Sequence, residues 1–223
     1  MIRVHVICEG QTEEQFVNEL LQPVFMDKGL WLLPALVGKP GHKGGKFKFE
    51  RLRTDVENRL LKERTAYCTT FFDFYGLPED FPGKPGLDAN LDIAQKAMTI
   101  KSEMTATLTC HLGQDAMRRF IPYIQMYEFE ALLFSNPEAF ASGVDRPHLT
   151  EELRSIASDF ETPERINNDP NTAPSKRIEK LIPGYEKPLL GSLAALEMGL
   201  PVIREKCRLF DAWLCELEAI PTE

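Results

Sequence analysis

The first sixteen residues constrain the fold more than any other part of the chain. An apolar, β-branched run at residues 2–7 leads into Glu9 and Gly10, and helical spacing of apolar residues follows. This order predicts a buried strand, a tight turn at Gly10, and a helix over 12–27 capped by Thr12. Glu9 then stands at the carboxyl end of the strand, where open α/β sheets bind their ligands. A carboxylate there is well placed to hold a divalent cation.

The rest of the chain alternates strand and helix patterns before it becomes helical. Apolar runs predict three further strands, at 31–37, 66–74 and 120–126. Helical spacing predicts helices at 47–64, 88–105, 149–160, 174–181, 188–199 and 202–218. This order indicates an α/β fold with a mainly parallel sheet of about four strands, flanked by helices. We expect an α/β core over 1–136 and a helical subregion over 137–223 packed on it, within one structural domain.

Composition excludes several classes of protein. No apolar run approaches the roughly 20 residues of a membrane-spanning helix, and the amino-terminal strand lacks the pattern of a signal peptide. The net charge of −8 argues against broad, charge-driven coating of nucleic acid. We therefore expect a cytoplasmic protein without a membrane partner. Five scattered cysteines without CxxC spacing fit a reduced protein without a zinc site: Cys8, Cys68, Cys110, Cys207 and Cys215.

A second carboxylate repeats the placement of Glu9. Asp73 ends the strand predicted at 66–74, just before a turn that contains Gly76. If the two strands are neighbours in the sheet, both carboxylates face one crevice. Hard oxygen ligands of this kind suit Mg²⁺, which uses few protein carboxylates. The alternative is that Asp73 only caps the following loop, but the equivalent position of Glu9 favours the metal site.

A third acidic element, Glu128 and Glu130, follows the strand predicted at 120–126. If strand geometry continues, the two side chains share one face. If a helix has begun, they diverge by about 160°, and only one of them faces the site. Acidic residues are also common at helix starts, which accounts for one glutamate better than for two. We favour Glu128, which is closer to the strand end, and keep Glu130 beside it.

Basic residues gather in two places that could bind phosphate. The glycine-rich loop at 38–46 carries Lys43 and Lys46, and loops of this kind bring backbone N–H groups and ammonium groups onto anions. Lys176 and Arg177 lie in the first turn of a predicted helix, where cations oppose the helix dipole unless an anion is bound. The alternatives are a solvated surface loop and an exposed helix.

Several stretches of the chain resemble a known group of proteins. Glu9-Gly10-Gln11-Thr12-Glu13 after a first strand, with an Asp ending a later strand, looks like the TOPRIM domain of topoisomerases, primases and OLD-family nucleases. The chain as a whole resembles a bacterial family of small TOPRIM-like proteins of unassigned function, encoded beside an ABC-type or AAA ATPase, as in AbiL-type phage-defence pairs. The matching stretches are VICEGQTEEQF, GHKGGK, FFDFYGLP, YIQMYEFEALLFS, NTAPSKRI, PGYEKPLLG and MGLPVIREKCRLFDAWL.

The resemblance implies a TOPRIM/Rossmann-like sheet and roles for individual residues. Glu9 matches the TOPRIM glutamate, a general acid/base or metal ligand, and Asp73 matches the first Asp of the DxD pair that binds Mg²⁺. The second Asp position is Tyr75, so one expected carboxylate is missing. Our hypothesis is that Glu128 or Glu130 replaces it.

Together these residues predict metal-assisted hydrolysis of a phosphodiester in DNA or RNA. Glu9, Asp73 and Glu128 or Glu130 would hold one or two Mg²⁺ ions, with Mn²⁺ as a substitute. The loop lysines and the basic pair at 176–177 would orient the phosphate, and an ATPase partner would deliver substrate or control activity. One alternative is a catalytically silent sensor or effector subunit that docks on that ATPase. Another is a phosphatase or nucleotide-processing enzyme that acts on small substrates.

Overall fold

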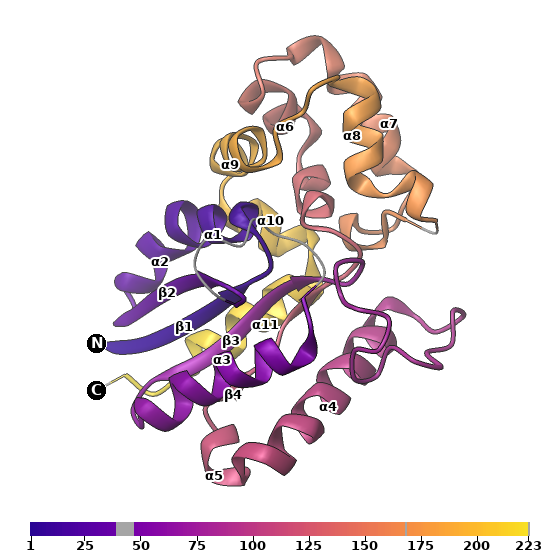
Figure 1. The fold of residues 1–223 in the computed structure, drawn as a ribbon. Helices are drawn as coiled ribbons and strands as arrows, with labels where there is room; N and C mark the ends of the chain where they lie inside the picture. Colours follow the sequence, from indigo (N-terminus) through magenta and orange to yellow (C-terminus); the bar gives the residue numbers. More distant parts are fainter. Residues whose placement is uncertain (39–46, 168, 223) are drawn as a thin grey trace.

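The computed structural model describes residues 1–38, 47–167 and 169–222 and contains a parallel sheet between helical layers (Figure 1). Its strands are β1 (Ile2–Cys8), β2 (Leu30–Leu36), β3 (Tyr67–Asp73), β4 (Phe120–Ile121) and β5 (Ile124–Gln125). The order is β2-β1-β3-β4, with β5 also beside β3, and every pair is parallel. The predicted α/β class and mainly parallel sheet are therefore confirmed.

The central strand β1 is apolar on both faces because helices cover both sides of the sheet. Val4, Val6 and Cys8 point into one core, and Ile7 points into the other. The neighbouring strand β2 forms an edge, and it contains Pro34 opposite Val6. Proline lacks the N–H that an interior strand needs on both sides, so this edge position is the one where it is tolerated.

The strand predicted at 120–126 is split into β4 and β5. Between them lies Pro122-Tyr123, and the side chain of Thr70 on β3 bonds the backbone there. Its hydroxyl donates to the carbonyl of Tyr123 at 2.8 Å and accepts from the N–H of Tyr123 at 3.0 Å. At Tyr123 the Thr70 side chain thus takes the place of a backbone partner in the sheet. The apolar pattern of the sequence does not reveal this interruption.

The helix predicted at 12–27 is distorted in its middle. It consists of α1 (Gln11–Phe16), the π-helical turn η1 (Val17–Leu21) and α2 (Gln22–Met26). Pro23 cannot donate to the preceding turn, and this missing bond favours the wider π turn before it. The cap is Gly10 and not Thr12 as predicted, because the side chain of Glu13 reaches back and accepts from the N–H of Gly10 at 2.8 Å.

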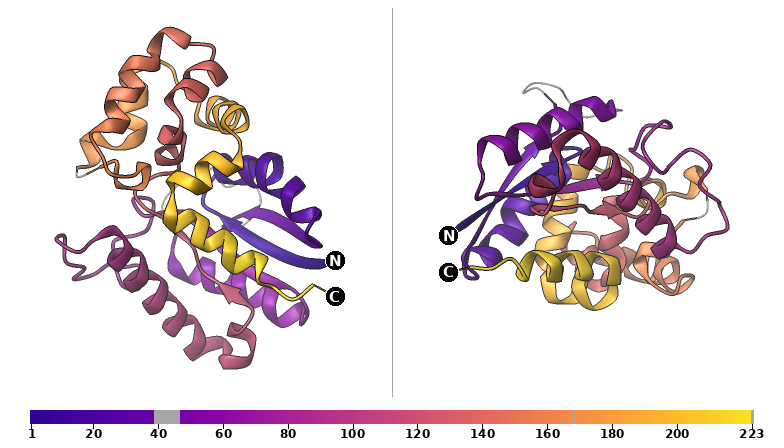
Figure 2. Two further views of the ribbon diagram at one scale, coloured as in Figure 1. Left: turned by 180° about the vertical axis from the view of Figure 1, so that it is seen from behind. Right: turned by 90° about the horizontal axis from the view of Figure 1, so that it is seen from below.

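Helices from both ends of the chain cover the sheet. Helices α3 (Phe49–Lys62), α4 (Ile93–Leu112) and α5 (Gln114–Met117) pack on one face, and α11 (Arg208–Glu218) packs on the other (Figures 1 and 2). The indole N–H of Trp213 in α11 donates to the hydroxyl of Thr69 in β3 at 2.8 Å. The carboxyl-terminal helix is therefore part of the layer that buries the sheet.

The remaining helices form a group beyond the carboxyl ends of the strands (Figure 1). They are α6 (Pro137–Gly143), α7 (Thr150–Ser158), α8 (Pro174–Leu181), α9 (Lys187–Met198) and α10 (Leu200–Lys206), with the 3₁₀ turns η2 (Phe129–Ser135), η3 (Pro147–Leu149), η4 (Pro163–Arg165) and η5 (Pro170–Thr172). The helix predicted at 202–218 is instead α10 and α11, which meet at Cys207, and α6 was not predicted.

Helix α9 joins this group to the sheet region because it packs against both α1 and α6. The approach is close: a Cβ on Gly191 of α9 would lie 3.8 Å from Cγ2 of Thr12 in α1, and one on Gly143 of α6 would lie 2.7 Å from Cα of Ala194 in α9. The boundary predicted at residue 136 stays a prediction. Within the described parts of the chain, no helix is long and apolar enough to cross a membrane.

Candidate functional site

The structure brings Glu9 and Asp73 together at one end of the sheet. Strands β1 and β3 are parallel neighbours, and Cys8 lies level with Phe71. The N–H of Glu9 donates to the carbonyl of Phe71 at 3.1 Å, which extends the ladder by one residue. The N–H of Asp73 then donates to Oε2 of Glu9 at 3.0 Å. Glu9 and Asp73 are therefore neighbours at the carboxyl ends of these two strands.

Gly76, in the turn after β3, makes room for the Glu9 carboxylate. A Cβ at this position would lie 2.0 Å from Oε1 and 2.2 Å from Oε2 of Glu9. These separations are far inside any van der Waals contact, so only a glycine leaves Glu9 in place. The turn after Asp73 thus fixes the position of the Glu9 side chain, which follows the neighbouring strand β1.

Glu13 adds a carboxylate that the sequence analysis treated only as part of a helix start. Its side chain is 5% exposed, and it faces the same end of the sheet. Burial, together with the nearby charge of Glu9, raises the pKa of Glu13 to about 8. The sequence does place Glu13 near Glu9, because only one tight turn separates the two residues. A role in helix capping, however, accounts for an acid at this position equally well.

Glu130 is the deepest acid of the site, and it is paired with Lys187. Its side chain is 1% exposed, and Oε1 lies 3.0 Å from Nζ of Lys187, the first residue of α9. Oε2 accepts no hydrogen bond from the described residues. Burial acts to lower the pKa of Lys187, but the carboxylates of Glu130, Glu128 and Asp73 outweigh it and raise this pKa. The sequence analysis did not identify Lys187.

Glu128 lies beside these groups and also supports a helix. It is half-buried in an extended conformation, and η2 begins at the next residue. Its Oε2 accepts from the backbone N–H of Ser175 at 2.8 Å, in the first turn of α8. The charges of Glu128 and Glu130 both act to raise the pKa of Glu9. Both glutamates therefore reach the site, one from an extended residue and the other from a 3₁₀ turn.

We call these five side chains the acid cluster: Glu9, Glu13, Asp73, Glu128 and Glu130. Burial raises the pKa of Glu9 to about 7 and holds the pKa values of Asp73 and Glu130 above their usual range. Oδ1 of Asp73 has no hydrogen-bond partner in the described part of the chain. Buried carboxylate oxygens without partners are costly unless a proton or a cation is bound. In the described part of the chain, Lys187 is the one ammonium group paired with the cluster, so its other acids keep protons or need a cation.

A divalent cation fits the cluster in donor chemistry. Carboxylate oxygens are the ligands that Mg²⁺ and Mn²⁺ prefer, and the unpartnered oxygens of Asp73 and Glu130 are available to it. Among the described residues, however, no three acidic, histidine or cysteine side chains are spaced as a formed metal site. Coordination by three of the cluster acids therefore requires their side chains to rearrange.

Tyr75, at the position of the missing second Asp, is held by its surroundings. Its hydroxyl accepts a hydrogen bond from Nδ2 of Asn167, and its ring lies against Tyr127 with the ring centres 5.4 Å apart. Burial raises the pKa of Tyr75 to about 12, so the hydroxyl stays protonated at neutral pH. It supplies no anionic ligand to the site.

Of the four predicted phosphate-binding residues, the structure describes Lys176 and Arg177, and both have partners outside the acid cluster. Lys43 and Lys46 lie outside the described residues. Lys176 is exposed and pairs with Glu179 at 2.7 Å. Arg177 donates from Nε to the carbonyl of Thr172 at 2.8 Å, and its guanidinium lies 5.2 Å from the ring centre of Phe160. The role of these residues in phosphate binding stays a prediction.

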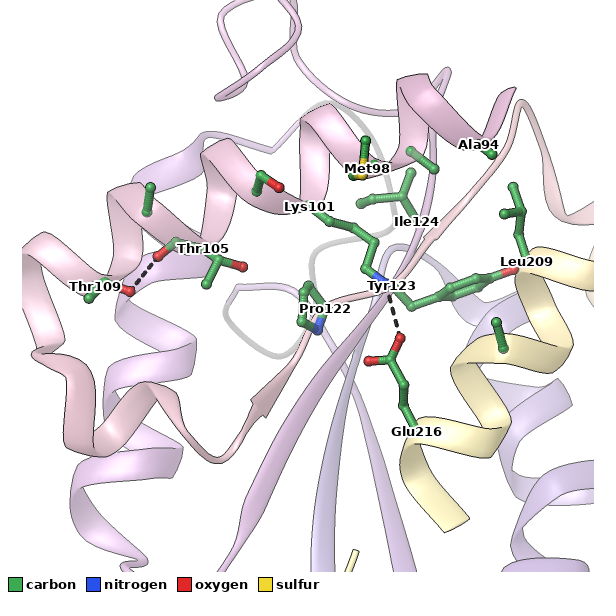
Figure 3. A pocket seen from close by; sticks show the side chains of 14 residues that line it. Ala94, Met98, Lys101, Thr105, Thr109, Pro122, Tyr123, Ile124, Leu209 and Glu216 are labelled. Carbon is green, nitrogen blue, oxygen red and sulfur yellow. Dashed lines mark hydrogen bonds and ion pairs between the residues drawn. The ribbon is translucent and has the colours of Figure 1, made fainter. Parts of the chain in front are cut away.

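A separate pocket of about 790 Å³ lies between α4 and α11, beside residues 122–124 (Figure 3). Small and apolar side chains such as Ala97 and Ala212 line it, and the ion pair of Lys101 with Glu216, at 3.3 Å, crosses it. None of the acid-cluster residues lines this pocket. It is therefore not the site of the chemistry that the cluster can perform.

Comparisons with known proteins give one family and one distant structure. Residues 8–218 match the family described as "Domain of unknown function (DUF4276)". No curated protein matches the chain. Among solved structures, the chain is similar to the C-terminal region of the Xanthomonas campestris pv. campestris OLD protein, with 14% identity, a TM-score of 0.37, and coverage of 97% of this chain and 98% of that chain. A TM-score this low supports no argument about the site.

Proposed function

This chain belongs to the DUF4276 family, whose function is unknown, and we propose that it is a metal-dependent phosphodiesterase that cleaves nucleic acid. One observation supports this most: acids from α1, from β3 and from the segments after β1 and β5 converge at the carboxyl ends of the strands, with buried oxygens left without partners. Sites of this kind in parallel α/β sheets bind ligands. Carboxylates grouped around Mg²⁺ are a common means of phosphodiester hydrolysis.

The surroundings of each acid indicate its role in the proposed reaction. Asp73, Glu130 and Glu128 would hold the cation through their hard carboxylate oxygens, once their side chains rearrange to bring these oxygens together. When bound, the cation supplies neutralisation of the phosphodiester charge and a lowered pKa for water. The N–H of Asp73 fixes the carboxylate of Glu9, whose pKa near 7 suits proton transfer at neutral pH. Glu9 would take a proton from the water that attacks phosphorus and return it to the leaving oxygen, which departs as an alcohol when its P–O bond breaks.

A second candidate function is a catalytically silent subunit that binds an ABC-type or AAA ATPase in phage defence. The position of Tyr75 favours it, because the hydroxyl is bonded to Asn167 and provides no carboxylate where the TOPRIM pattern has an Asp. Association with such an ATPase is expected from the resemblance under either function. Co-purification of the two proteins, expressed together, tests that association.

Cleavage assays separate the two functions. The substrates are plasmid DNA, single-stranded DNA, total RNA and tRNA, each with Mg²⁺ and then with Mn²⁺. We expect cutting by the native protein and its loss in Glu9→Gln and Asp73→Asn. The exposed residues Glu152 and Asp80 provide matched controls, since Glu152→Gln and Asp80→Asn make the same chemical changes away from the site.

Two results would contradict the nuclease proposal. If the native protein cuts nothing, even with the ATPase added, the silent subunit is favoured. If mononucleotides abolish cutting of oligonucleotides at equal concentration, the preferred substrate is a small phosphate ester and not a polymer.

A further inference from the structure

The ammonium group of Lys187 lies against the acid cluster, so the chain itself supplies a positive charge there. We propose that Lys187 is an internal counter-ion that competes with a divalent cation for Glu130, and that cation binding releases its ammonium group from that carboxylate. This inference rests on the proposed function only in assuming that the cluster binds a divalent cation. The inference makes Lys187 a positioning residue that loses its partner Glu130 when a divalent cation binds.

The contact itself is close and well defined. Nζ of Lys187 lies 3.0 Å from Oε1 of Glu130, and the other oxygen of that carboxylate has no hydrogen-bond partner in the described chain. No other ion pair to an acid-cluster side chain is found among the described residues. Among the described residues, Lys187 is thus the one cationic side chain paired with the five acids, and the remaining acids keep protons or need a further cation.

The two partners differ in how freely they can move. Glu130 is 1% exposed, and the turn η2 that carries it is buried along its whole length. The side chain of Lys187 is 40% exposed, and it extends from the first residue of α9. A lysine has a flexible four-carbon stem, and its end can reach water at little cost. When the pair separates, the lysine therefore leaves and the glutamate stays.

Electrostatics makes the two cations exclude each other. Like charges a few ångströms apart repel strongly when water is largely absent between them. An ammonium group at Oε1 of Glu130 therefore weakens binding of a divalent cation by the same carboxylate. By thermodynamic linkage, the cation weakens the Lys187–Glu130 contact by the same factor.

The test measures metal binding by the full chain and not activity. Calorimetric titration with MnCl₂ compares the native protein with Lys187→Gln, Lys187→Arg and Lys176→Gln. We expect Lys187→Gln to bind Mn²⁺ about tenfold more tightly than the native protein. Lys187→Arg keeps the charge, and Lys176→Gln removes an exposed lysine paired elsewhere, so both should bind Mn²⁺ like the native protein.

A second measurement needs no variant at position 187. Reductive methylation of lysines, read by mass spectrometry, reports how accessible each amine is. We expect the labelling rate of Lys187 to rise severalfold when MgCl₂ saturates the site, with no change at Lys176. If Lys187→Gln fails to fold, as judged by circular dichroism, this measurement decides alone.

The outcomes separate this inference from the proposed function. Equal or weaker Mn²⁺ binding by Lys187→Gln, or unchanged labelling at saturating MgCl₂, overturns the inference and leaves the proposed function standing. Absence of Mn²⁺ and Mg²⁺ binding in every protein overturns both.

Discussion

Replacement of Gly76 by alanine tests how the turn after β3 positions Glu9. The new Cβ would lie 2.0 Å from Oε1 and 2.2 Å from Oε2 of Glu9, whereas ordinary contacts begin at 3.4 Å. The backbone at Gly76 does not have a positive φ, so alanine is allowed there. The flexible part is the Glu9 side chain, and its carboxylate must move by more than about 1 Å.

The expected effect is large on activity and small on stability. Misplacement of a catalytic group by about 1 Å costs about a hundredfold in rate, so we expect kcat/KM of Gly76→Ala to fall by that factor. The displaced carboxylate also loses the 3.0 Å hydrogen bond from the N–H of Asp73. Loss of one such bond lowers the free energy of unfolding by about 1–2 kcal/mol.

A double-mutant cycle shows whether Glu9 carries the effect. In a Glu9→Ala background no carboxylate opposes the new methyl group, so Gly76→Ala should change neither the remaining activity nor the free energy of unfolding measured in urea. The stability arm of this cycle does not require the protein to be an enzyme. Equal destabilisation by Gly76→Ala in both backgrounds would refute the steric reasoning, as would full activity of the single variant.

Three further predictions concern stability, each measured by chemical denaturation. Burial raises the pKa of Glu13 from an ordinary value of 4.5 to about 8, so the folded protein binds this proton more tightly than the unfolded chain. Without metal, the free energy of unfolding of the native protein should therefore fall as pH rises from about 4.5 to about 8. Glu13→Gln should make this dependence on pH weaker. An unchanged dependence on pH would contradict the assigned burial of Glu13. Trp213→Phe removes the bond to Thr69 and should cost about 1–3 kcal/mol, because a buried hydroxyl is left with one partner fewer. Arg119 donates to three carbonyls at residues 60, 63 and 66, around the end of α3, so Arg119→Met should cost about 3 kcal/mol; a cost below about 1 kcal/mol would show that water replaces it.

Much of the fold follows from the sequence because its signals are local. Strand patterns with helices between them require parallel pairing, and parallel strands present their carboxyl ends at the same edge. The meeting of Glu9 and Asp73 was predictable for that reason. Helix α6 also carried a local signal that was missed: Asn136 accepts from the N–H of Ala139 at 3.0 Å, and Pro137 occupies the first turn.

The parts of the site that could not be predicted come from tertiary contacts. Lys187 reaches Glu130 from a different helix, and nothing near it in the sequence indicates an acidic partner. The break between β4 and β5 depends on the hydroxyl of Thr70, which lies on another strand. Glu13 could be read as a helix cap, and the structure shows that it is both a cap and a buried member of the cluster.

The position of α11 has a consequence for the cooperativity of folding. One face of the sheet is closed by Phe210, Trp213 and Leu214, which belong to the last described helix. The ring centre of Phe71 lies 5.3 Å from that of Trp213 and 5.9 Å from that of Phe16 in α1, so segments far apart in the sequence cover this face together. We infer that this side of the sheet becomes stable only when both segments have docked, because contacts between distant segments form late in folding.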